Sequence, residues 1–227
     1  MKGFVREIFS SLQGEGLLVG QRMTFVRFYG CNLSCAYCDT QDARSRTGVL
    51  LYKNERFTNP VTIDSVCEKV GDRVVAITGG EPLLQKDFLT EICLALKRLR
   101  KSLYLETNGS LPGALEGVVD HFDTIALDFK IPTATRQSQM WAEHERALIC
   151  ASQSSVFVKA VVTNDIQVSE IMKVCEIIAR VRKSIPLVIQ PVYGTRITDL
   201  LDVQERALDL IDDVRIIPQV HKYLGLK

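Results

Sequence analysis

The sequence predicts an α/β fold built from parallel βα units, and two observations lead to this prediction. Short apolar runs alternate with segments of helical periodicity over most of the 227 residues. Polar turns directly follow several of the apolar runs, and in parallel βα folds such turns leave the carboxyl ends of the strands, where ligands bind. The pattern favours a doubly wound sheet or a complete or partial barrel, and it leaves the choice between them open.

The apolar runs have the length and composition of buried strands. We expect strands at Thr24–Tyr29, Val74–Thr78, Leu103–Glu106, Asp123–Leu127, Val156–Val162, Pro186–Gln190 and Val214–Ile217. Helical spacing of apolar residues predicts helices at Thr62–Val70, Lys86–Leu99, Thr135–Ile149, Ile166–Val181 and Thr198–Ile211. The stretch Gln41–Thr58 lacks clean periodicity and is expected to form a loop or an irregular excursion. Because no linker or repeat divides the chain, residues 1–227 should form a single domain.

The composition is that of an ordinary globular protein, with 46% hydrophobic and 24% charged residues. Lys and Arg number 28 against 27 Asp and Glu, and the formal net charge of +1 argues against bulk electrostatic binding to nucleic acid or an anionic membrane. No stretch has the length of a transmembrane helix, and Met1–Ser10 contains Arg6 and Glu7 rather than a signal sequence. We therefore expect a cytoplasmic protein.

Three of the seven cysteines form a compact motif, Cys31-Asn-Leu-Ser-Cys35-Ala-Tyr-Cys38. This spacing would also fit one face of a helix, but Gly30 and Asn32 are more typical of a turn. A structural zinc site normally takes four protein ligands, and no fourth Cys or His lies nearby in the sequence. A [4Fe-4S] cluster held by three thiolates fits the count and leaves one iron open to another ligand. The remaining cysteines should be small buried apolar residues: Cys67, Cys93, Cys150 and Cys175.

The CxxxCxxC spacing resembles that of the radical S-adenosylmethionine superfamily, in which the open iron binds the amino and carboxylate groups of S-adenosylmethionine. Tyr37, directly before Cys38, also matches that pattern. The turn Gly79-Gly80-Glu81-Pro82 after a predicted strand is a second match. It resembles the superfamily's contact with the amino group of the cofactor, for which Glu81 offers an acceptor. The resemblance implies a [4Fe-4S] cluster and S-adenosylmethionine as cofactors.

A closer resemblance, to the 7-carboxy-7-deazaguanine synthase family, covers nearly the whole chain. It is carried by residues 7–16, 25–35, 38–40, 106–109 and 217–222. These carbon–nitrogen lyases contract the ring of 6-carboxy-5,6,7,8-tetrahydropterin to 7-carboxy-7-deazaguanine with loss of ammonia, and the product is a precursor of queuosine and archaeosine. Family members are typically homodimers. The resemblance implies the same reaction here, and a modified or incomplete (βα) barrel of the radical SAM type.

The same resemblance assigns roles to individual residues. Thr40 would be a magnesium ligand, although a Thr at this place could equally cap a local turn. The residues implied to contact S-adenosylmethionine are Tyr37, Asp39, Gly79, Gly80, Glu81, Lys130 and Gln190. Lys130 stands in Asp128-Phe-Lys130, where the family has Ser-Pro-Lys. The residues implied to contact the substrate are Leu12, Gln13, Gly14, Arg27, Thr78, His221 and Lys227, the last through its terminal carboxylate.

Arg27 also has a physical reason to contact an anion. It shares one face of its predicted strand with Phe25 and Tyr29, so its guanidinium should need a carboxylate partner. The carboxylate of the pterin would suit a planar bidentate pair, and an internal Arg–Glu pair is the alternative.

Two other functions remain open from the sequence. A glycyl-radical-enzyme activase would use the same cofactors on a protein backbone, and Arg27 with the segments 13–14 and 218–221 favours the pterin over it. A non-catalytic Fe–S or zinc module would have a four-ligand metal site and would not cleave S-adenosylmethionine. The radical chemistry also requires a reductant, such as a flavodoxin or a ferredoxin.

Overall fold

The computed structural model describes residues 1–45 and 48–227, in which one large sheet contains ten strands. These are β2 (Val5–Leu12), β3 (Arg22–Phe28), β4 (Val49–Tyr52), β5 (Glu55–Thr58), β7 (Val74–Gly79), β8 (Ser102–Thr107), β9 (Thr124–Asp128), β10 (Val156–Val162), β11 (Leu187–Pro191) and β12 (Val214–Ile216). A separate pair joins β1 (Lys2–Gly3) to β6 (Val61–Thr62). Every strand expected from the sequence is present, within two residues of its expected bounds.

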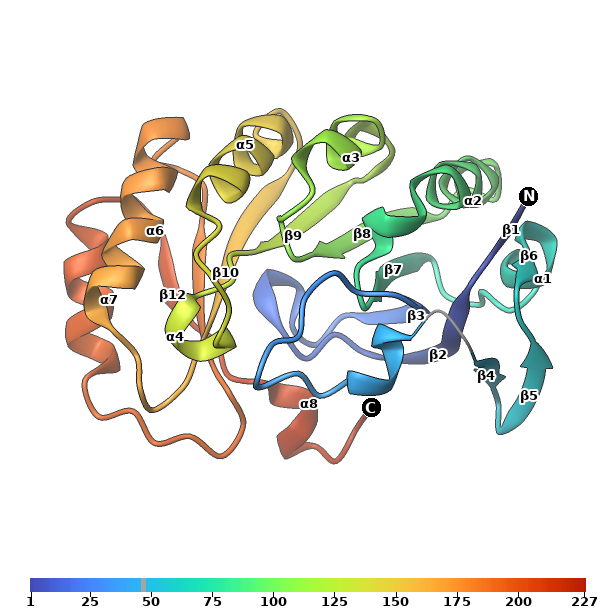
Figure 1. Ribbon diagram of the computed structural model, residues 1–227, viewed down its shortest axis with the longest axis horizontal. Helices are drawn as coiled ribbons and strands as arrows, with labels where there is room; N and C mark the ends of the chain where they lie inside the picture. Colours follow the sequence, from blue (N-terminus) through green and yellow to red (C-terminus); the bar gives the residue numbers. More distant parts are fainter. Residues whose placement is uncertain (46–47) are drawn as a thin grey trace.

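The helices pack mainly on one side of this sheet (Figure 1). They are α1 (Ile63–Cys67), α2 (Lys86–Arg98), α3 (Pro112–Glu116), α4 (Pro132–Thr135), α5 (Trp141–Ala151), α6 (Val168–Val181), α7 (Leu200–Leu208) and α8 (Val220–Tyr223). Short 3₁₀ turns lie at Gly16–Leu18, Gln41–Arg44, Pro82–Gln85 and Val119–His121. No helix of the described residues is long and apolar enough to cross a membrane.

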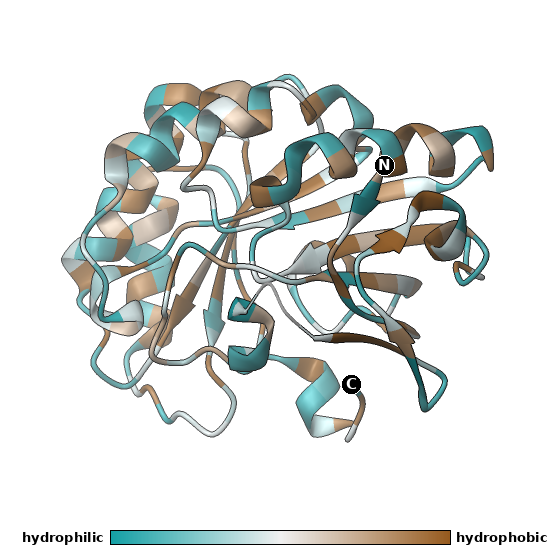
Figure 2. Cartoon of the chain, turned by 45° about the vertical axis from the view of Figure 1, so that its right-hand side comes forward, coloured by the Kyte–Doolittle hydropathy of each residue, from teal (hydrophilic) through white to brown (hydrophobic). Residues whose placement is uncertain are grey.

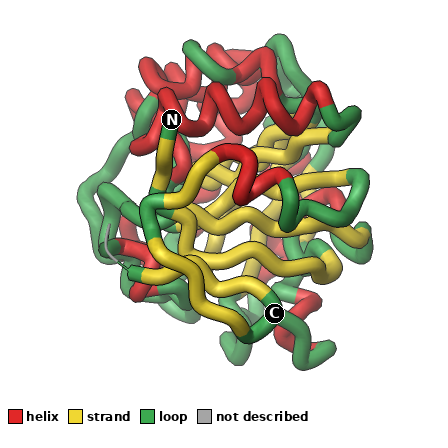
Figure 3. Tube along the Cα trace, turned by 90° about the vertical axis from the view of Figure 1, so that its right-hand side faces the viewer, coloured by secondary structure: helices red, strands yellow, loops and turns green. Residues whose placement is uncertain are grey.

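The strand order decides between the doubly wound sheet and the barrel. Across the sheet the order is β12-β11-β10-β9-β8-β7-β3-β2-β4-β5, so the parallel strands from β3 to β12 are neighbours in chain order. Every crossover therefore advances in the same direction, and right-handed crossovers carry their helices to one face. Figure 3 shows the strands curving beneath the helices. Within the described residues β12 and β5 do not pair with each other, so the fold is an incomplete (βα) barrel, as expected.

The expected helix Thr135–Ile149 is wrong in its first half. The chain instead forms the single turn α4, and Arg136 leaves it in the left-handed conformation with φ of 58°. The Thr135 hydroxyl donates to the Ile131 carbonyl oxygen, which closes this turn locally. The longer helix α5 begins only at Trp141. The periodicity of the sequence predicted one helix, whereas the left-handed Arg136 divides the segment into α4 and α5.

The expectation of a loop at Gln41–Thr58 is also wrong. A 3₁₀ turn is followed by the hairpin β4–β5, whose two tip residues, Lys53 and Asn54, have positive φ. Strand β4 pairs with β2, which the sequence analysis did not identify as a strand. Strands β2 and β4 pair with each other although they lie far apart in the sequence. A short strand that depends on such a distant partner shows little periodicity in its own sequence. Residues 46–47 of this stretch lie outside the described residues.

Inward-facing side chains form two layers inside the barrel. The first layer is apolar and fills the end of the barrel where the strands begin; it consists of Met23, Phe25, Ala76, Tyr104, Ala126, Phe157 and Val188. Side chains two positions further along a strand point to the same face. These positions form a polar layer at the carboxyl ends of the strands: Arg27, Thr78, Glu106, Asp128, Lys159 and Gln190.

A larger apolar cluster lies between the outer face of the sheet and the helices. Figure 2 shows hydrophobic colouring along the strands and mixed colouring on the helices. The apolar faces of α2, α5 and α6 cover the sheet from outside, so the inner face is left for the polar layer.

Candidate active site

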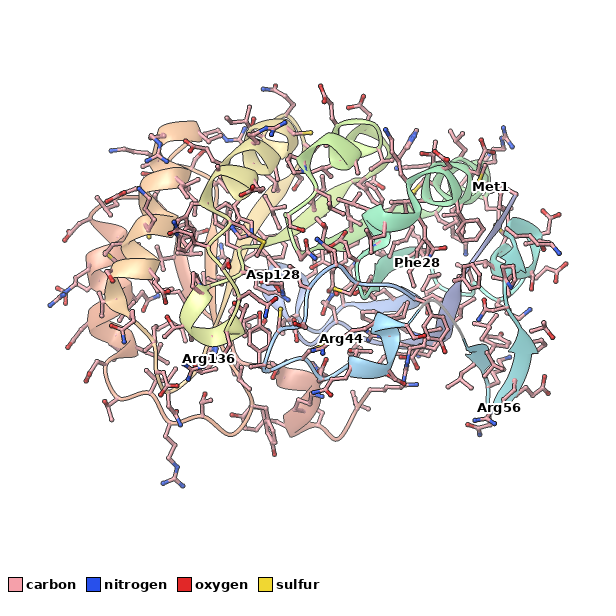
Figure 4. All side chains as sticks on the ribbon, viewed as in Figure 1. Met1, Phe28, Arg44, Arg56, Asp128 and Arg136 are labelled. Carbon is pink, nitrogen blue, oxygen red and sulfur yellow. The ribbon has the colours of Figure 1, made fainter. Side chains whose placement is uncertain are left out.

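The polar layer forms the floor of a cavity of about 410 Å³, a volume in the usual range for small-molecule sites. Its walls come from the loop after β3, the turn after β7, the segment 12–15 at the end of β2 and the C-terminal segment. Figure 4 labels Arg44 and Asp128 in the middle of the molecule, between the strands and the C-terminal segment. All the site residues expected from the sequence except Glu81 line this single cavity.

The three motif cysteines lie in the loop that follows β3. All three are free, with Cys35 buried and Cys31 and Cys38 partly buried, and all three line the cavity. The Cys38 N–H donates to the Cys35 carbonyl oxygen (3.2 Å), so the motif forms a turn and not the face of a helix. Burial raises the pKa of the Cys31 and Cys35 thiols. Arg44 closes the loop by donating to the Cys35 carbonyl oxygen (3.0 Å).

The glycine turn after β7 packs directly on the start of the cysteine loop. Gly79 has φ of 149°, and a Cβ there would come within 2.5 Å of the Phe28 backbone. A Cβ at Gly80 would overlap the carbonyl group of Gly30. The Glu81 N–H donates to that same carbonyl oxygen (2.7 Å). Glycine is therefore required at both positions by close backbone approach.

Glu81, whose side chain the resemblance offered as an acceptor for the cofactor, is not among the residues that line the cavity. Its carboxylate is fully buried and accepts from the Leu83 N–H (3.1 Å), the Thr107 hydroxyl (2.9 Å) and the Asn108 N–H (2.7 Å). Burial raises its pKa, and these donors oppose the rise. Because its carboxylate is bonded both to the end of β8 and to its own turn, Glu81 holds the glycine turn in place.

Arg27 lines the cavity and also has the internal partner that was the alternative from the sequence. Its Nε donates to Glu7 Oε1 (2.8 Å). Glu7 is almost completely buried, and Arg6 and Lys227 pair with the same carboxylate. Arg6 is also paired with Asp42, so three cations face two anions and the cluster keeps an excess of positive charge. Arg27 and Lys227 both lie over the ring of Phe9.

Glu106 joins two of the expected substrate residues. Gln13 Nε2 donates to Glu106 Oε1 (2.9 Å), and the Thr78 hydroxyl donates to Glu106 Oε2 (2.7 Å). Beside them, Phe9 and Phe25 stack with ring centroids 5.1 Å apart. The arrangement places a carboxylate and an apolar surface together, which suits a flat ring with N–H donors on its edge.

Thr40 and Asp39 meet the C-terminal segment at the mouth of the cavity. The Thr40 hydroxyl donates to Asp39 Oδ1 (2.9 Å), and Lys222 Nζ lies 3.1 Å from Asp39 Oδ2. The hydroxyl and the ammonium group together lower the pKa of Asp39 against the effect of its burial. Because Thr40 uses its proton on Asp39, its oxygen lone pairs remain free to face a cation.

The C-terminal segment closes one side of the cavity. His221 packs on Gly14, where a Cβ would overlap the imidazole, and the Val220 N–H donates to the Gly14 carbonyl oxygen (2.9 Å). Lys227 reaches Glu7 with its side-chain Nζ, so the contact that we see from this residue is made by the ammonium group. The expectation for Lys227 concerned its terminal carboxylate instead.

The chain matches the Radical SAM superfamily model over residues 25–200. It is 38% identical to the 7-carboxy-7-deazaguanine synthase of Geobacter sulfurreducens, with 97% of this chain and 96% of the relative covered. It is 34% identical to the protein of the same name from Archaeoglobus fulgidus, with all of both chains covered. The chain belongs to the 7-carboxy-7-deazaguanine synthase family. It is therefore a radical SAM enzyme, and its cofactors are a [4Fe-4S] cluster and S-adenosylmethionine.

The fold agrees with this family. The crystal structure of QueE from Escherichia coli superposes with a TM-score of 0.66 at 22% identity, covering 97% of this chain and 95% of that one. A structure of TYW1 with a bound lysine–pyruvate adduct gives a TM-score of 0.57 at 11% identity, covering 83% of this chain and 73% of that one. At these identities the two structures support the fold alone.

The cysteine loop fits the cluster of the deazaguanine synthase family in its donor set. Three free thiols line one cavity, and thiolates are the ordinary ligands of iron–sulfur clusters. Within the part of the chain that the structure describes, no three Cys, His, Asp or Glu side chains are gathered closely enough to hold a metal ion. A cluster spreads its thiolates over separate irons, so it does not need the close gathering that a single ion needs, and the thiols would lose their protons on binding it.

Several cavity residues were missed by sequence reasoning. Glu106 stands in a motif that the family resemblance included, but it received no role. Lys159 is a single charge in the otherwise apolar strand β10, and that contrast was the available signal. Glu15 and Asp128 carried no signal of their own, because a carboxylate in a turn or at a strand end is ordinary. Their importance follows from which residues the barrel brings to them.

Proposed function

We propose that this chain converts 6-carboxy-5,6,7,8-tetrahydropterin to 7-carboxy-7-deazaguanine with loss of ammonia, in the synthesis of deazapurine precursors of queuosine or archaeosine. The observation that carries the proposal is that one cavity joins the three thiols to a cationic cluster and a ring-sized polar pocket. When bound, the iron–sulfur cluster and S-adenosylmethionine supply a 5′-deoxyadenosyl radical.

The substrate carboxylate would bind at the cationic cluster around Arg27. A ligand carboxylate that approached Arg27 and Lys227 would share the positive charge that Glu7 alone does not neutralise. His221 packs on Gly14 in the wall of the same cavity. A bidentate guanidinium contact fixes both the position and the orientation of a carboxylate.

The edge of the pterin would be read by the Gln13–Glu106–Thr78 group, with Leu12 in the adjoining wall. A carboxylate has about four lone-pair sites, so Glu106 can accept from the ligand while it keeps its two protein donors. The stacked rings of Phe9 and Phe25 would support the bicyclic ring from one side.

S-adenosylmethionine would bind along the opposite wall, against Tyr37, Asp39, Gly79, Gly80, Lys130 and Gln190. Two buried acceptor atoms in this region, Asp128 Oδ1 and Gln190 Oε1, have no hydrogen-bond partner among the described residues. Buried acceptors of this kind are costly until a donor arrives, so they suit a ligand with hydroxyl or N–H groups.

Magnesium would bind at Thr40 Oγ1, with substrate and water oxygens completing its octahedron. The proposal also includes a single domain over residues 1–227, a homodimer in solution, and a small redox protein such as a flavodoxin or ferredoxin as reductant. Size-exclusion chromatography with light scattering tests the homodimer, and a monomer would remove it.

The proposed reaction is tested with anaerobically reconstituted protein, reductant, S-adenosylmethionine and the carboxytetrahydropterin. Mass spectrometry should detect 7-carboxy-7-deazaguanine together with 5′-deoxyadenosine and methionine. Cleavage of S-adenosylmethionine without any deazaguanine would mean that the substrate is wrong and would favour an activase. A four-ligand zinc site without cofactor cleavage would favour a non-catalytic module.

A further inference from the structure

A lysine in the middle of the barrel links the two halves of the cavity. Lys159 lies on β10, whose seven residues are all buried, and its side chain is 9% exposed. An ammonium group in such a place destabilises the fold unless it is well paired. Its Nζ lies 2.7 Å from Glu15 Oε2 and 3.3 Å from Asp128 Oδ2. Lys159 is therefore shared between two carboxylates that come from distant parts of the chain.

The chain of contacts continues toward the cysteine loop. Asp128 Oδ2 is also paired with Lys130 Nζ (2.8 Å), and Lys130 Nζ donates to the hydroxyl of Tyr37 (3.2 Å). Tyr37 directly precedes the third cysteine. The alternating series Glu15–Lys159–Asp128–Lys130 has two negative and two positive groups, so its charges balance inside the barrel. We call these four side chains the buried charge chain.

The other end of the buried charge chain lies among the residues of the proposed substrate side. Glu15 follows Gln13 and Gly14 directly, and its Oε1 accepts from Gln219 Nε2 of the C-terminal segment (2.9 Å). The pKa of Glu15 is strongly lowered, against the effect of burial, by Lys159 and Gln219. Glu15 therefore holds the segment 13–15 and the C-terminal segment against the barrel floor.

One atom of the buried charge chain has no partner. Asp128 Oδ1 is buried and unpartnered among the described residues, while Oδ2 holds both lysines. A ligand that donates a hydrogen bond to Oδ1 would change the charge and position of the carboxylate that holds Lys159. Through Lys159 it would also affect Glu15, the next residue in the chain of contacts. Charged groups in a buried network respond to one another because water does not screen them.

We propose that Lys159 is a positioning residue that couples the S-adenosylmethionine side of the cavity to the substrate side through the buried charge chain. When S-adenosylmethionine occupies the Asp128–Lys130 end, Lys159 and Glu15 are fixed in place. The segment 13–15, which would bind the pterin, is then fixed as well. The cofactor therefore raises the affinity for the substrate, and by linkage the substrate raises the affinity for the cofactor by the same factor. This inference rests on the proposed function.

The test is an equilibrium binding measurement on the cluster-loaded enzyme without reductant, so that no turnover occurs. The dissociation constant of carboxytetrahydropterin is measured with and without saturating S-adenosylmethionine. In the wild type we expect the cofactor to tighten pterin binding by about fivefold or more, the lower end of ordinary coupling. The ratio of the dissociation constant without the cofactor to that with it measures the coupling. In Lys159→Met this ratio should fall to about one.

A matched control comes from the outer face of the barrel. Lys97 pairs with Asp123 at 2.7 Å but lies outside the cavity, so Lys97→Met should keep the wild-type ratio. If Lys159→Met does not retain its cluster or its fold, Glu15→Gln breaks the next link with little change of shape and should also lose the ratio. A merely structural role would lower the melting temperature of either variant and leave the ratio unchanged.

The possible failures are distinguishable. If the wild type does not bind carboxytetrahydropterin at all, the proposed substrate is wrong. If it binds the pterin but the cofactor has no effect on the affinity, the coupling is refuted. An unchanged ratio in a folded Lys159→Met or Glu15→Gln protein likewise refutes the role of Lys159, whatever the substrate.

Discussion

The sharpest test of the substrate site is the removal of Arg27. In Arg27→Ala the buried carboxylate of Glu7 keeps two cationic partners, Arg6 and Lys227, so we expect only a small loss of stability. Binding of the pterin carboxylate should suffer much more. A hydrogen bond to a charged group contributes ~1.5–3 kcal/mol, and the partly exposed side chain of Arg27 argues for about 2 kcal/mol. At 1.4 kcal/mol for each factor of ten, the affinity should fall roughly thirtyfold.

The conservative variant adds information about geometry. Lysine keeps the charge of Arg27 but not the planar fork, so it cannot form a bidentate pair with the ligand carboxylate. We expect Arg27→Lys to recover part of the loss, with affinity reduced roughly fivefold, or about 1 kcal/mol. The matched control is Arg22→Ala, which removes an exposed arginine from the other end of β3, where it pairs with partly buried Asp72 outside the cavity.

The assay is equilibrium binding of carboxytetrahydropterin under anaerobic conditions, compared with cofactor cleavage in the absence of the pterin. Cleavage without substrate should survive in Arg27→Ala, because the cysteine loop and the glycine turn are untouched. Pterin affinity within twofold of the wild type in Arg27→Ala would refute the assignment. Arg27 would then serve only to neutralise Glu7.

Four further predictions follow from the site. Alanine at any one of the three cluster cysteines should abolish cofactor cleavage and iron loading, whereas Cys67→Ala should retain about four irons per chain; full cleavage in a triad variant would overturn the cluster assignment. Thr40→Val, which nearly keeps the shape, should weaken the acceleration of turnover by magnesium and leave the iron content unchanged, so an unaltered magnesium titration removes Thr40 from the metal site. Glu81→Gln should lower the melting temperature of the cofactor-free protein, because an amide replaces a carboxylate that accepts from three donors. A loss of ~1–3 kcal/mol in stability corresponds to roughly 3–10 °C. An unchanged melting temperature would return Glu81 to a direct ligand role. Burial lowers the pKa of His144 to about 4, below the ordinary value of 6.5, so the unfolded chain binds a proton at a higher pH than the folded protein does. The free energy of unfolding should therefore fall by ~2 kcal/mol from pH 7 to pH 5. His144→Gln should flatten that pH dependence in urea titrations.

The sequence by itself determined most of the secondary structure and the two motifs that line one side of the cavity. Apolar runs specify the strands because a parallel sheet covered by helices buries both faces of each strand. The cysteine spacing and the glycine turn could be recognised because each is a short segment. Its residue types are set by what that segment itself must do, which is to bind a cluster or to let the backbone approach closely. Each lies at the carboxyl end of a strand, so their meeting in one cavity followed from the expected fold.

Only the tertiary structure decided which groups are partners. Arg27 meets Glu7 because β2 and β3 are antiparallel in this register, and β2 was not recognisable as a strand alone. Glu81 turned inward because the end of β8 presents two donors to it, and the Leu83 N–H of its own turn supplies a third. The buried charge chain needs the adjacency of β9 and β10 together with the return of the segment after β2, and such contacts depend on strand order rather than on local pattern. A carboxylate in a sequence is an ordinary surface residue until the fold removes its water and supplies a cation.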